Sequence, residues 1–375
     1  MPLFSLVRWL AIAATLALVW YGAWFIHQWW DLREVERARD ADLQSWRWLA
    51  AGIGTYALLL LGRGPILLLI ARPGRERSPM RGEEHRRLDL ADGSKVQVEL
   101  FGPADGQPLV LLHGWGLDSS VWRYVRGRLG GRYRIIAPDL PGLGRSSGPD
   151  DGRYTLDRYA DMLAAVLALA EGRPALLAGH SIGGMIIQTF ARRHPEALRS
   201  RVAGLVLCNT TYTQPIRTMV LSKVAQALRW PVIEPMSRLE ILLSPMVHLM
   251  NWLSWLNGSL HLGLRLTGFG SKVTREQLDH VARLHAKHSP AVQAKGLLAM
   301  LRWDASEVAA GLPVPVLVVG GMIDLVTKLE AGDRIAEQAP RGELLPVADA
   351  GHGGLVDQAA PYAGAIDAFA AAAAR

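Results

Sequence analysis

The sequence has a single cysteine, Cys208, and no internal repeat or low-complexity linker. One thiol excludes an internal disulfide and a cysteine-rich zinc site. Charged residues are also scarce, at 20 % of the chain, and the basic ones are spread along it rather than grouped with aromatic residues. This distribution argues against nucleic acid as a partner, even though the formal net charge is +7.

Apolar residues, by contrast, are abundant. Half of the 375 residues are hydrophobic and 13 are Trp. This apolar content is high for a water-soluble domain and indicates association with a membrane. Because a single hydrophobic core stops growing at about 250 to 300 residues, this length predicts one large domain with attachments.

Two apolar runs, at residues 9–30 and 49–71, lie within the first 78 residues. Each is close to the roughly 20 residues that a helix needs to cross a bilayer. Arg63 interrupts the second run, at a cost of about 2.5 to 3.5 kcal/mol near a span centre, which the flanking Leu and Ile residues offset. We therefore predict a kinked second span, and a transmembrane hairpin over residues 1–78. Tryptophans at the facing ends of the runs favour one shared interface: Trp29, Trp30, Trp46 and Trp48.

A cleaved signal peptide is the alternative for the first run, but no small-residue cleavage site follows it. Arginines decide the expected orientation, because basic residues accumulate on the cytoplasmic side. More of them flank the two runs than fill the loop between them. The prediction is a multi-pass protein of the bacterial inner-membrane type with its main domain in the cytoplasm. The flanking arginines are Arg8, Arg72, Arg75, Arg77, Arg81, Arg86 and Arg87, and those of the loop are Arg33, Arg37, Arg39 and Arg47.

Beyond residue 78 the pattern changes to short apolar runs alternating with amphipathic stretches. This alternation predicts an α/β fold with a mostly parallel sheet covered by helices on both faces. It occupies residues 79–211 and 307–375, and a purely helical block over residues 212–306 interrupts it. Strands are expected at residues 96–101, 109–112, 135–137, 175–179, 202–208, 314–319 and 343–347.

Ser181 is the candidate nucleophile. It lies in Gly-His-Ser-Ile-Gly, after an apolar strand and before a helical stretch, which is the setting of a nucleophile elbow. The same Gly-x-Ser-x-Gly pattern recurs around Ser146, but there it has no strand before it and no helix after it. Ser146 is therefore interpreted as a turn residue.

Two backbone N–H groups are expected to form an oxyanion hole. The N–H of Ile182 begins the helix after Ser181, at the positive end of its dipole. Trp115 lies in His-Gly-Trp-Gly after the strand at 109–112, where its N–H can point to the same place. The Trp115 side chain either borders the substrate or packs in the core. His113 is interpreted as a loop anchor.

His352 follows the last expected strand and is the candidate base, which takes the proton from Ser181 and returns it to the leaving group. Asp324 follows the preceding strand and is the candidate acid that orients His352. A helix cap is the alternative role for Asp324. Asp349 is a rival acid, but it is too close to His352 in sequence to reach it across the sheet.

Together these motifs resemble the α/β-hydrolase superfamily, in its lid-bearing serine esterase and lipase branch. Asp139 to Ser146 adds a further family motif, Asp-x-x-Gly-x-Gly-x-Ser, in the expected order. The resemblance extends from about Arg86 to the C-terminus. Within this superfamily, the chain resembles membrane-anchored monoacylglycerol lipases and carboxylesterases. It implies an α/β-hydrolase fold, a helical lid over residues 212–306, and a Ser181, Asp324 and His352 triad that needs no cofactor or metal.

The expected activity is hydrolysis of lipophilic carboxylic esters, such as monoacylglycerol-like esters, through an acyl-enzyme. The lid contains an apolar stretch at residues 241–256, which either packs on the core or touches the bilayer. The partners would be a lipid-like ester and the membrane. The alternatives are a carbon-carbon bond hydrolase or acyltransferase with the same triad, and a catalytically silent membrane scaffold.

All triad and oxyanion residues lie after Arg86. The sequence therefore predicts that the hairpin is a simple anchor that takes no part in the chemistry.

Overall fold

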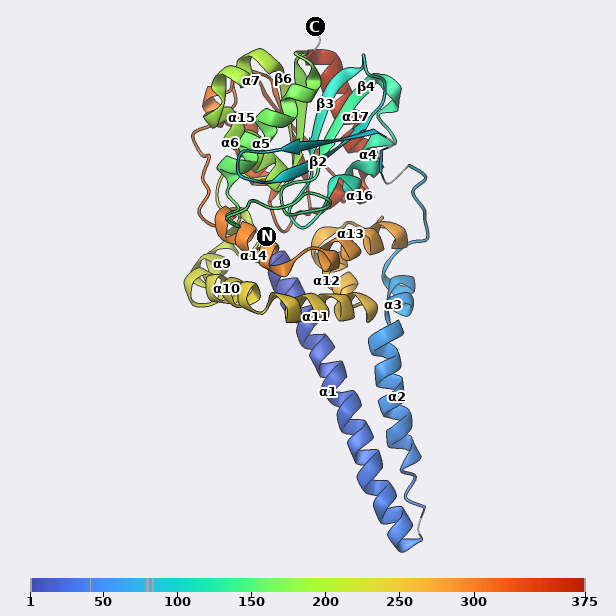
Figure 1. Ribbon diagram of the computed structural model, residues 1–375. Helices are drawn as coiled ribbons and strands as arrows, with labels where there is room; N and C mark the ends of the chain where they lie inside the picture. Colours follow the sequence, from blue (N-terminus) through green and yellow to red (C-terminus); the bar gives the residue numbers. More distant parts are fainter. Residues whose placement is uncertain (1, 41, 79–80, 83, 374–375) are drawn as a thin grey trace.

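The computed structural model of the protein describes residues 2–40, 42–78, 81–82 and 84–373. Its parts form three layers (Figure 1): a sheet with its covering helices, a helical layer beneath it, and a stalk of two long helices.

The sheet has eight strands in the order β1-β2-β4-β3-β5-β6-β7-β8. Strand β2 runs antiparallel to both of its neighbours, and all other pairs are parallel. The strands are β1 Glu84–Asp89, β2 Lys95–Phe101, β3 Gln107–Leu112, β4 Tyr133–Pro138, β5 Ala175–His180, β6 Val202–Cys208, β7 Val316–Gly321 and β8 Gly342–Val347. This is the predicted α/β-hydrolase fold, in which all seven expected strands are present.

Strand β1 is the one strand that the sequence did not predict. Its residues are mostly charged and it lies at the edge of the sheet, paired only with β2. An edge strand of this kind has no buried face and so no alternation of apolar residues for a pattern to detect.

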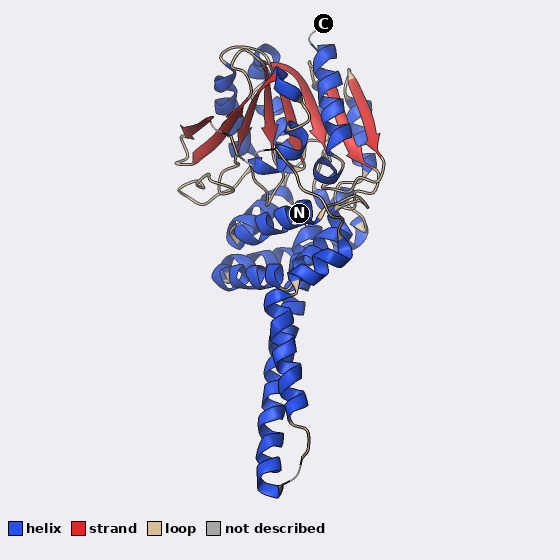
Figure 2. Ribbon diagram, turned by 90° about the vertical axis from the view of Figure 1, so that its right-hand side faces the viewer, coloured by secondary structure: helices blue, strands red, loops and turns tan. Residues whose placement is uncertain are grey.

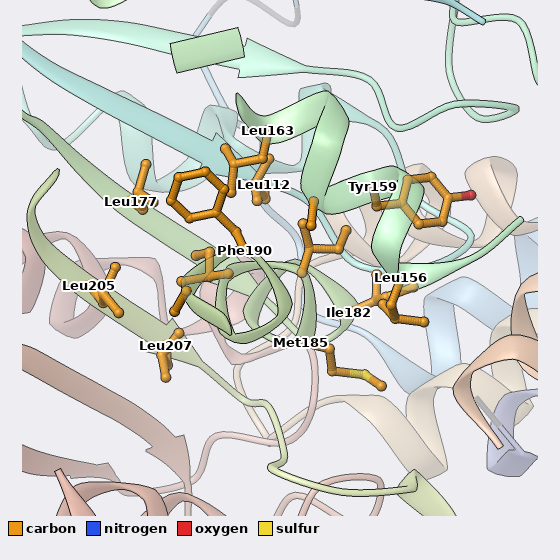
Figure 3. Packing of buried hydrophobic residues seen from close by; sticks show 14 of the residues in the cluster. Leu112, Leu156, Tyr159, Leu163, Leu177, Ile182, Met185, Phe190, Leu205 and Leu207 are labelled. Atoms are coloured by element: carbon orange, nitrogen blue, oxygen red, sulfur yellow. The ribbon is translucent and has the colours of Figure 1, made fainter. Parts of the chain in front are cut away.

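Helices cover both faces of the sheet because alternate strand residues point to opposite sides. In β3, Val110 and Leu112 belong to the core on one face, and Leu109 and Leu111 to the core on the other. Figure 3 shows Leu112, Leu177, Leu205 and Leu207 of the strands against Leu163 and Phe190 of the helices. The core helices are α4 Arg123–Arg126, α5 Leu156–Val166, α6 Ile182–Arg193, α7 Pro195–Arg201, α15 Leu329–Gln338, α16 Gly354–Asp357 and α17 Ala359–Ala373.

A helical insertion, residues 215–300, separates β6 from β7. It forms the layer between the sheet and the stalk (Figure 2). Its helices are α8 Pro215–Thr218, α9 Ser222–Ala227, α10 Glu234–Leu242, α11 Ser244–Leu256, α12 Ser259–Gly268, α13 Arg275–Lys287 and α14 Pro290–Met300. The insertion follows the carboxyl end of a central strand, so it lies at the edge of the sheet where the candidate site residues meet.

The stalk consists of α1, Pro2–Arg39, and α2, Trp46–Leu61, which lie side by side (Figure 1). Helix α1 is long and apolar enough to cross a membrane. The second expected span, residues 49–71, is bent, as expected of a kinked span. It divides at Gly62 into α2 and α3, Arg63–Ile70, with a bend of 66°.

The reason for the bend lies at Arg63. Its guanidinium bonds Asp279 of α13 at 3.0 Å and lies 3.9 Å from the centre of the Trp255 ring of α11. Helix α3 therefore packs on the insertion, and Arg63 finds a counter-charge there instead of lying inside a continuous span.

The start of α1 is embedded in the insertion. Val7, Ala11 and Ile12 are buried, and the Thr15 hydroxyl bonds the Ser254 hydroxyl of α11 at 2.8 Å. The first expected span, residues 9–30, thus begins inside the protein, and α1 leaves the insertion only after Thr15.

Candidate active site

Ser181 stands at a sharp turn between β5 and α6. Its backbone has φ 58° and ψ −116°, a region that L-residues rarely occupy. The turn depends on its two glycines. A Cβ on Gly179 would lie 2.4 Å from the Gly183 carbonyl carbon, and one on Gly183 would lie 2.5 Å from the Leu112 oxygen. The sequence therefore folds here into the predicted elbow, with the hydroxyl at the carboxyl edge of the sheet.

The three residues expected to form a triad lie together. The Ser181 Oγ is 3.0 Å from Nε2 of His352, and Nδ1 of His352 is 2.9 Å from Oδ2 of Asp324. They follow β5, β7 and β8, and all three are nearly inaccessible to solvent. This geometry allows proton transfer from serine to histidine with the histidine tautomer held by the carboxylate.

Asp324 is held by several donors. The backbone N–H groups of Val326 and Thr327 donate to Oδ1, and the Thr327 hydroxyl and the Asn209 amide donate to Oδ2. Burial alone would raise the pKa of Asp324, but the charge of His352 and these hydrogen bonds outweigh it and lower the pKa. Asp324 therefore faces His352 as a carboxylate. It is not the N-cap residue of α15, because Lys328 occupies that position.

Asn209 was not predicted from the sequence. It directly follows β6, with φ 44°, and its amide also donates to the Gly351 oxygen at 3.1 Å. The Tyr362 hydroxyl of α17 donates to its side-chain oxygen. A polar residue immediately after a buried strand is the signal that could have identified it, because such ends meet at the site in a parallel sheet.

His180, the residue before the nucleophile, supports His352 from its other side. Its Nε2–H donates to the His352 backbone oxygen at 2.8 Å. Burial and the neighbouring charge of His352 lower the pKa of His180 to about 3, so it stays neutral. The ring centroids of the two histidines are 5.0 Å apart.

The two expected oxyanion donors border the nucleophile. Trp115 and its neighbour Gly114 line the cavity that contains Ser181, and Ile182 begins α6. Neither the Trp115 N–H nor the Ile182 N–H donates to any residue that the structure describes. Both are thus available to a negative oxygen.

The side chain of Trp115 is both buried and part of the cavity wall. Its indole N–H donates to the Gln293 oxygen of α14 at 2.9 Å, and only 6 % of the residue is exposed. A Cβ on Gly296 would lie 1.9 Å from the indole ring, so α14 can approach only because this residue is glycine.

Three other residues have structural positions. His113 bonds the Gly114 oxygen and the Leu140 N–H, both at 2.9 Å, as a loop anchor does. Ser146 donates to the Asp139 oxygen within a turn. Asp349 bonds Ser271 and makes no bond to His352.

The cavity at Ser181 is small, at ≈ 30 Å³, which is room for about two water molecules. The core forms one side of it, and the insertion forms the other. Its apolar lining includes Leu117, Val121, Leu264, Phe269, Val281 and Val356.

Phe4 of α1 also lines this cavity, which corrects the expectation that the hairpin is separate from the site. The Phe4 ring centroid is 5.7 Å from that of His352 and 5.5 Å from that of His285. The sequence contained no signal for this contact, because it joins residues that are hundreds of positions apart.

Comparisons with known proteins agree with this fold and site. Residues 107–359 match the alpha/beta hydrolase fold family, and the chain belongs to that family. A pimeloyl-[acyl-carrier protein] methyl ester esterase of Sodalis glossinidius is 31 % identical over 282 residues, which cover 72 % of this chain and 96 % of the relative. A 2-hydroxymuconate semialdehyde hydrolase of Pseudomonas sp. strain CF600 is 36 % identical over 128 residues, 33 % of this chain and 44 % of the relative. The Sodalis relative supports a hydrolase of the esterase type.

Solved structures show the same fold. A putative aryl esterase from Burkholderia cenocepacia superposes with a TM-score of 0.63 at 21 % identity, covering 77 % of this chain and 99 % of that one. A bacterial membrane phospholipase A superposes with a TM-score of 0.61 at 21 % identity, covering 79 % and 88 %.

Proposed function

We propose that the protein is a membrane-anchored serine hydrolase that cleaves lipophilic carboxylic esters through an acyl-enzyme on Ser181. The observation that carries this proposal is the line of hydrogen bonds from Ser181 through His352 to Asp324, at the wall of a largely apolar cavity. The esterase activity named for the Sodalis relative supports the same chemistry.

The reaction follows from this arrangement. His352 removes the proton of Ser181 as its oxygen attacks the ester carbonyl carbon, and the N–H groups of Trp115 and Ile182 stabilise the negative oxygen. The protonated His352 then gives this proton to the leaving alcohol. Water, deprotonated by His352, attacks the acyl-enzyme and releases the carboxylic acid, which restores Ser181.

The apolar surroundings support a lipophilic substrate. Besides the cavity lining, the insertion exposes large apolar side chains, such as Trp230, Leu242 and Leu266 at 63 %, 75 % and 68 % exposure. Groups of this kind on a surface beside a span favour contact with the bilayer. A cavity of ≈ 30 Å³ is too small for an acyl chain, so the insertion acts as a lid that moves to admit one.

The membrane arrangement is part of the proposal. We infer that α1 and α2 cross the bilayer as a hairpin, with the hydrolase core and the start of α1 on the same side. The excess of arginine outside the loop favours the cytoplasmic side. The solved membrane phospholipase A offers a precedent for this fold at a membrane.

A serine-reactive probe tests the proposed nucleophile. A fluorophosphonate should label the full-length protein in detergent at Ser181, and Ser181→Ala should lose both labelling and turnover of p-nitrophenyl esters, by about 10⁴-fold or more. The matched control is Ser146→Ala, in the other Gly-x-Ser-x-Gly sequence, which should keep nearly full activity. Equal losses in both variants, or no labelling of the wild type, would refute the proposal.

The second candidate is carbon-carbon bond hydrolysis or acyl transfer with the same triad. The similarity to a 2-hydroxymuconate semialdehyde hydrolase supports this second candidate. A series of p-nitrophenyl esters of rising chain length separates the two, since an enzyme for lipophilic esters should prefer the longer members, whereas the alternative should show little ester turnover although Ser181 is labelled.

A further inference from the structure

A second cavity adjoins the one at Ser181. Its volume is ≈ 20 Å³, and it shares four wall residues with the first cavity: Phe4, Trp115, Leu264 and His285. Its remaining wall is mostly polar and comes from α1, α11, α12 and α14: Ser5, Arg8, Asn251, Leu260 and Gln293. The two cavities are therefore neighbouring compartments with a common wall.

Several polar atoms in or beside the second cavity lack partners. Asn251 is 1 % exposed, yet neither its amide nitrogen nor its oxygen forms a hydrogen bond with any described residue. The same holds for Nε of Arg8 and for Oε1 of Glu240. A buried polar group without a partner destabilises a protein, so such groups normally meet a bound molecule. Here the groups of Asn251 and Arg8 line a cavity that adjoins the one at Ser181.

The charges of the described side chains around this cavity cancel. The Arg8 guanidinium pairs with the Glu240 carboxylate, which is also buried, and donates to the Gln293 side-chain oxygen at 3.2 Å. His285 adds no charge, because burial lowers its pKa to about 3. A ligand group bound here would find hydrogen-bonding atoms without a net charge to attract an ion.

We propose that the second cavity is a substrate subsite, in which the Asn251 amide binds an uncharged hydroxyl group of the ester beside a wall formed by Phe4 and Arg8. The proposal rests on the proposed ester hydrolysis and names its substrate class: a lipophilic ester that carries a free hydroxyl group near the ester bond. The start of α1 then takes part in specificity as well as in anchoring.

Matched esters test this subsite in the full-length enzyme in detergent. Propyl butyrate is compared with 2,3-dihydroxypropyl butyrate, which has hydroxyl groups on the alcohol half, and with propyl 3-hydroxybutyrate, which has one on the acyl half. We expect wild-type kcat/KM to favour at least one hydroxylated ester by about tenfold. Asn251→Leu, of similar size, should remove that preference.

Ser254→Ala is the control on the same helix. Ser254 bonds Thr15 of α1 and does not line either cavity, so this variant should keep the wild-type preference. Monopropyl succinate, a charged ester, should be a poorer substrate than the hydroxylated ones.

Each result decides the proposal. Three outcomes would overturn the proposed subsite. The wild type could show no preference for either hydroxylated ester, it could prefer the charged ester, or its preference could survive Asn251→Leu. If Asn251→Leu does not fold, the wild-type ratios still decide. Turnover of propyl butyrate and fluorophosphonate labelling report on ester hydrolysis itself, so the subsite can fail while the proposed function stands.

Discussion

Five hydrogen-bond donors surround Asp324. The Asp324 carboxylate itself sets the tautomer of His352, whereas donors such as the Asn209 amide only position that carboxylate. Asp324→Asn should lower kcat by about 10⁴-fold with little change in KM, because an amide at this place favours the wrong tautomer of His352. Asn209→Ala should lower kcat by about tenfold, since it removes one of the bonds that position the carboxylate. Steady-state kinetics on a p-nitrophenyl ester measures both effects.

The control for this prediction is Asp349→Asn. Its side chain bonds Ser271, and its φ of 53° is one that asparagine tolerates. If this variant loses activity as Asp324→Asn does, the acid has been assigned to the wrong residue.

Asp357 is a carboxyl group whose protonation is linked to stability. Burial raises its pKa to about 7 from an ordinary value of 3.8, and only one of its oxygens has a partner among the described residues, the Gly270 N–H. Between these pH values the folded protein holds a proton that the unfolded chain releases. Its contribution to stability is therefore present at low pH and is lost as the pH rises toward 7.

Asp357→Asn should accordingly stabilise the protein at pH 8 and have little effect at pH 4, with a difference in unfolding free energy of at most about 4 kcal/mol. Thermal unfolding of both proteins in detergent across this range measures the difference. The buried histidines affect the wild type and the variant equally, so their contribution cancels when the two proteins are compared. A variant with the same pH dependence as the wild type would show that Asp357 is not the group responsible.

At this scale, prediction from the sequence depended on whether a residue lies in a local motif. Ser181, Asp324 and His352 each follow an apolar strand, and parallel strands bring such ends together. Asn209 follows a strand as well, but an asparagine in a turn has many structural roles. Phe4 belongs to no motif, and only the folded chain brings it to the site.

The elements of the stalk pack through small residues. Gly22 of α1 and Gly52 of α2 are buried where the helices meet, and a Cβ on Gly52 would lie 2.8 Å from the Cγ1 of Ile26. Close approach at glycine is a common way for helices to associate within a membrane. Gly54, half a turn further on, has no atom within 4 Å of its Cβ position.

Gly52→Leu should therefore separate the two helices and lower the stability of the protein by about 1 to 3 kcal/mol. Gly54→Leu should be neutral or slightly stabilising, because leucine favours a helix and would face outward. Thermal unfolding in detergent compares the two variants. Equal effects would mean that α1 and α2 do not pack as described.

Elements could be predicted where burial imposes a pattern. The strands at the centre of the sheet are continuous apolar runs, whereas the edge strand β1 has no such run. The second apolar run was predicted as a kinked span, because the hydropathy of the neighbouring leucines offsets the cost of inserting Arg63 into a bilayer. The contacts of Arg63 with Asp279 and Trp255 are tertiary, so the packing of α3 on the insertion could not be inferred, although the kink itself was expected.

The whole molecule links the stalk to the site through the start of α1. Helix α1 contacts α11 and α12 of the insertion, Phe4 borders the cavity of Ser181, and Arg8 pairs with the buried Glu240. The sequence suggested independent anchor and enzyme modules, because each is continuous in the chain. In the folded protein the anchor supplies a wall of the cavity, so a movement of α1 relative to the insertion would change the space beside Ser181.

Removing residues 1–80 tests this link. The truncated chain should keep its sheet, which has its own core, but lose most of its activity even on short soluble esters because Phe4 no longer closes the cavity. It should also be less stable, by about 3 to 5 kcal/mol, since Glu240 would be left buried without Arg8. Glu240→Gln in the truncated chain should recover part of this stability, because it removes the unpaired charge. Circular dichroism, thermal unfolding and p-nitrophenyl butyrate kinetics measure the three effects, and a truncated chain with the kcat/KM of the full-length protein would show that α1 only anchors the enzyme.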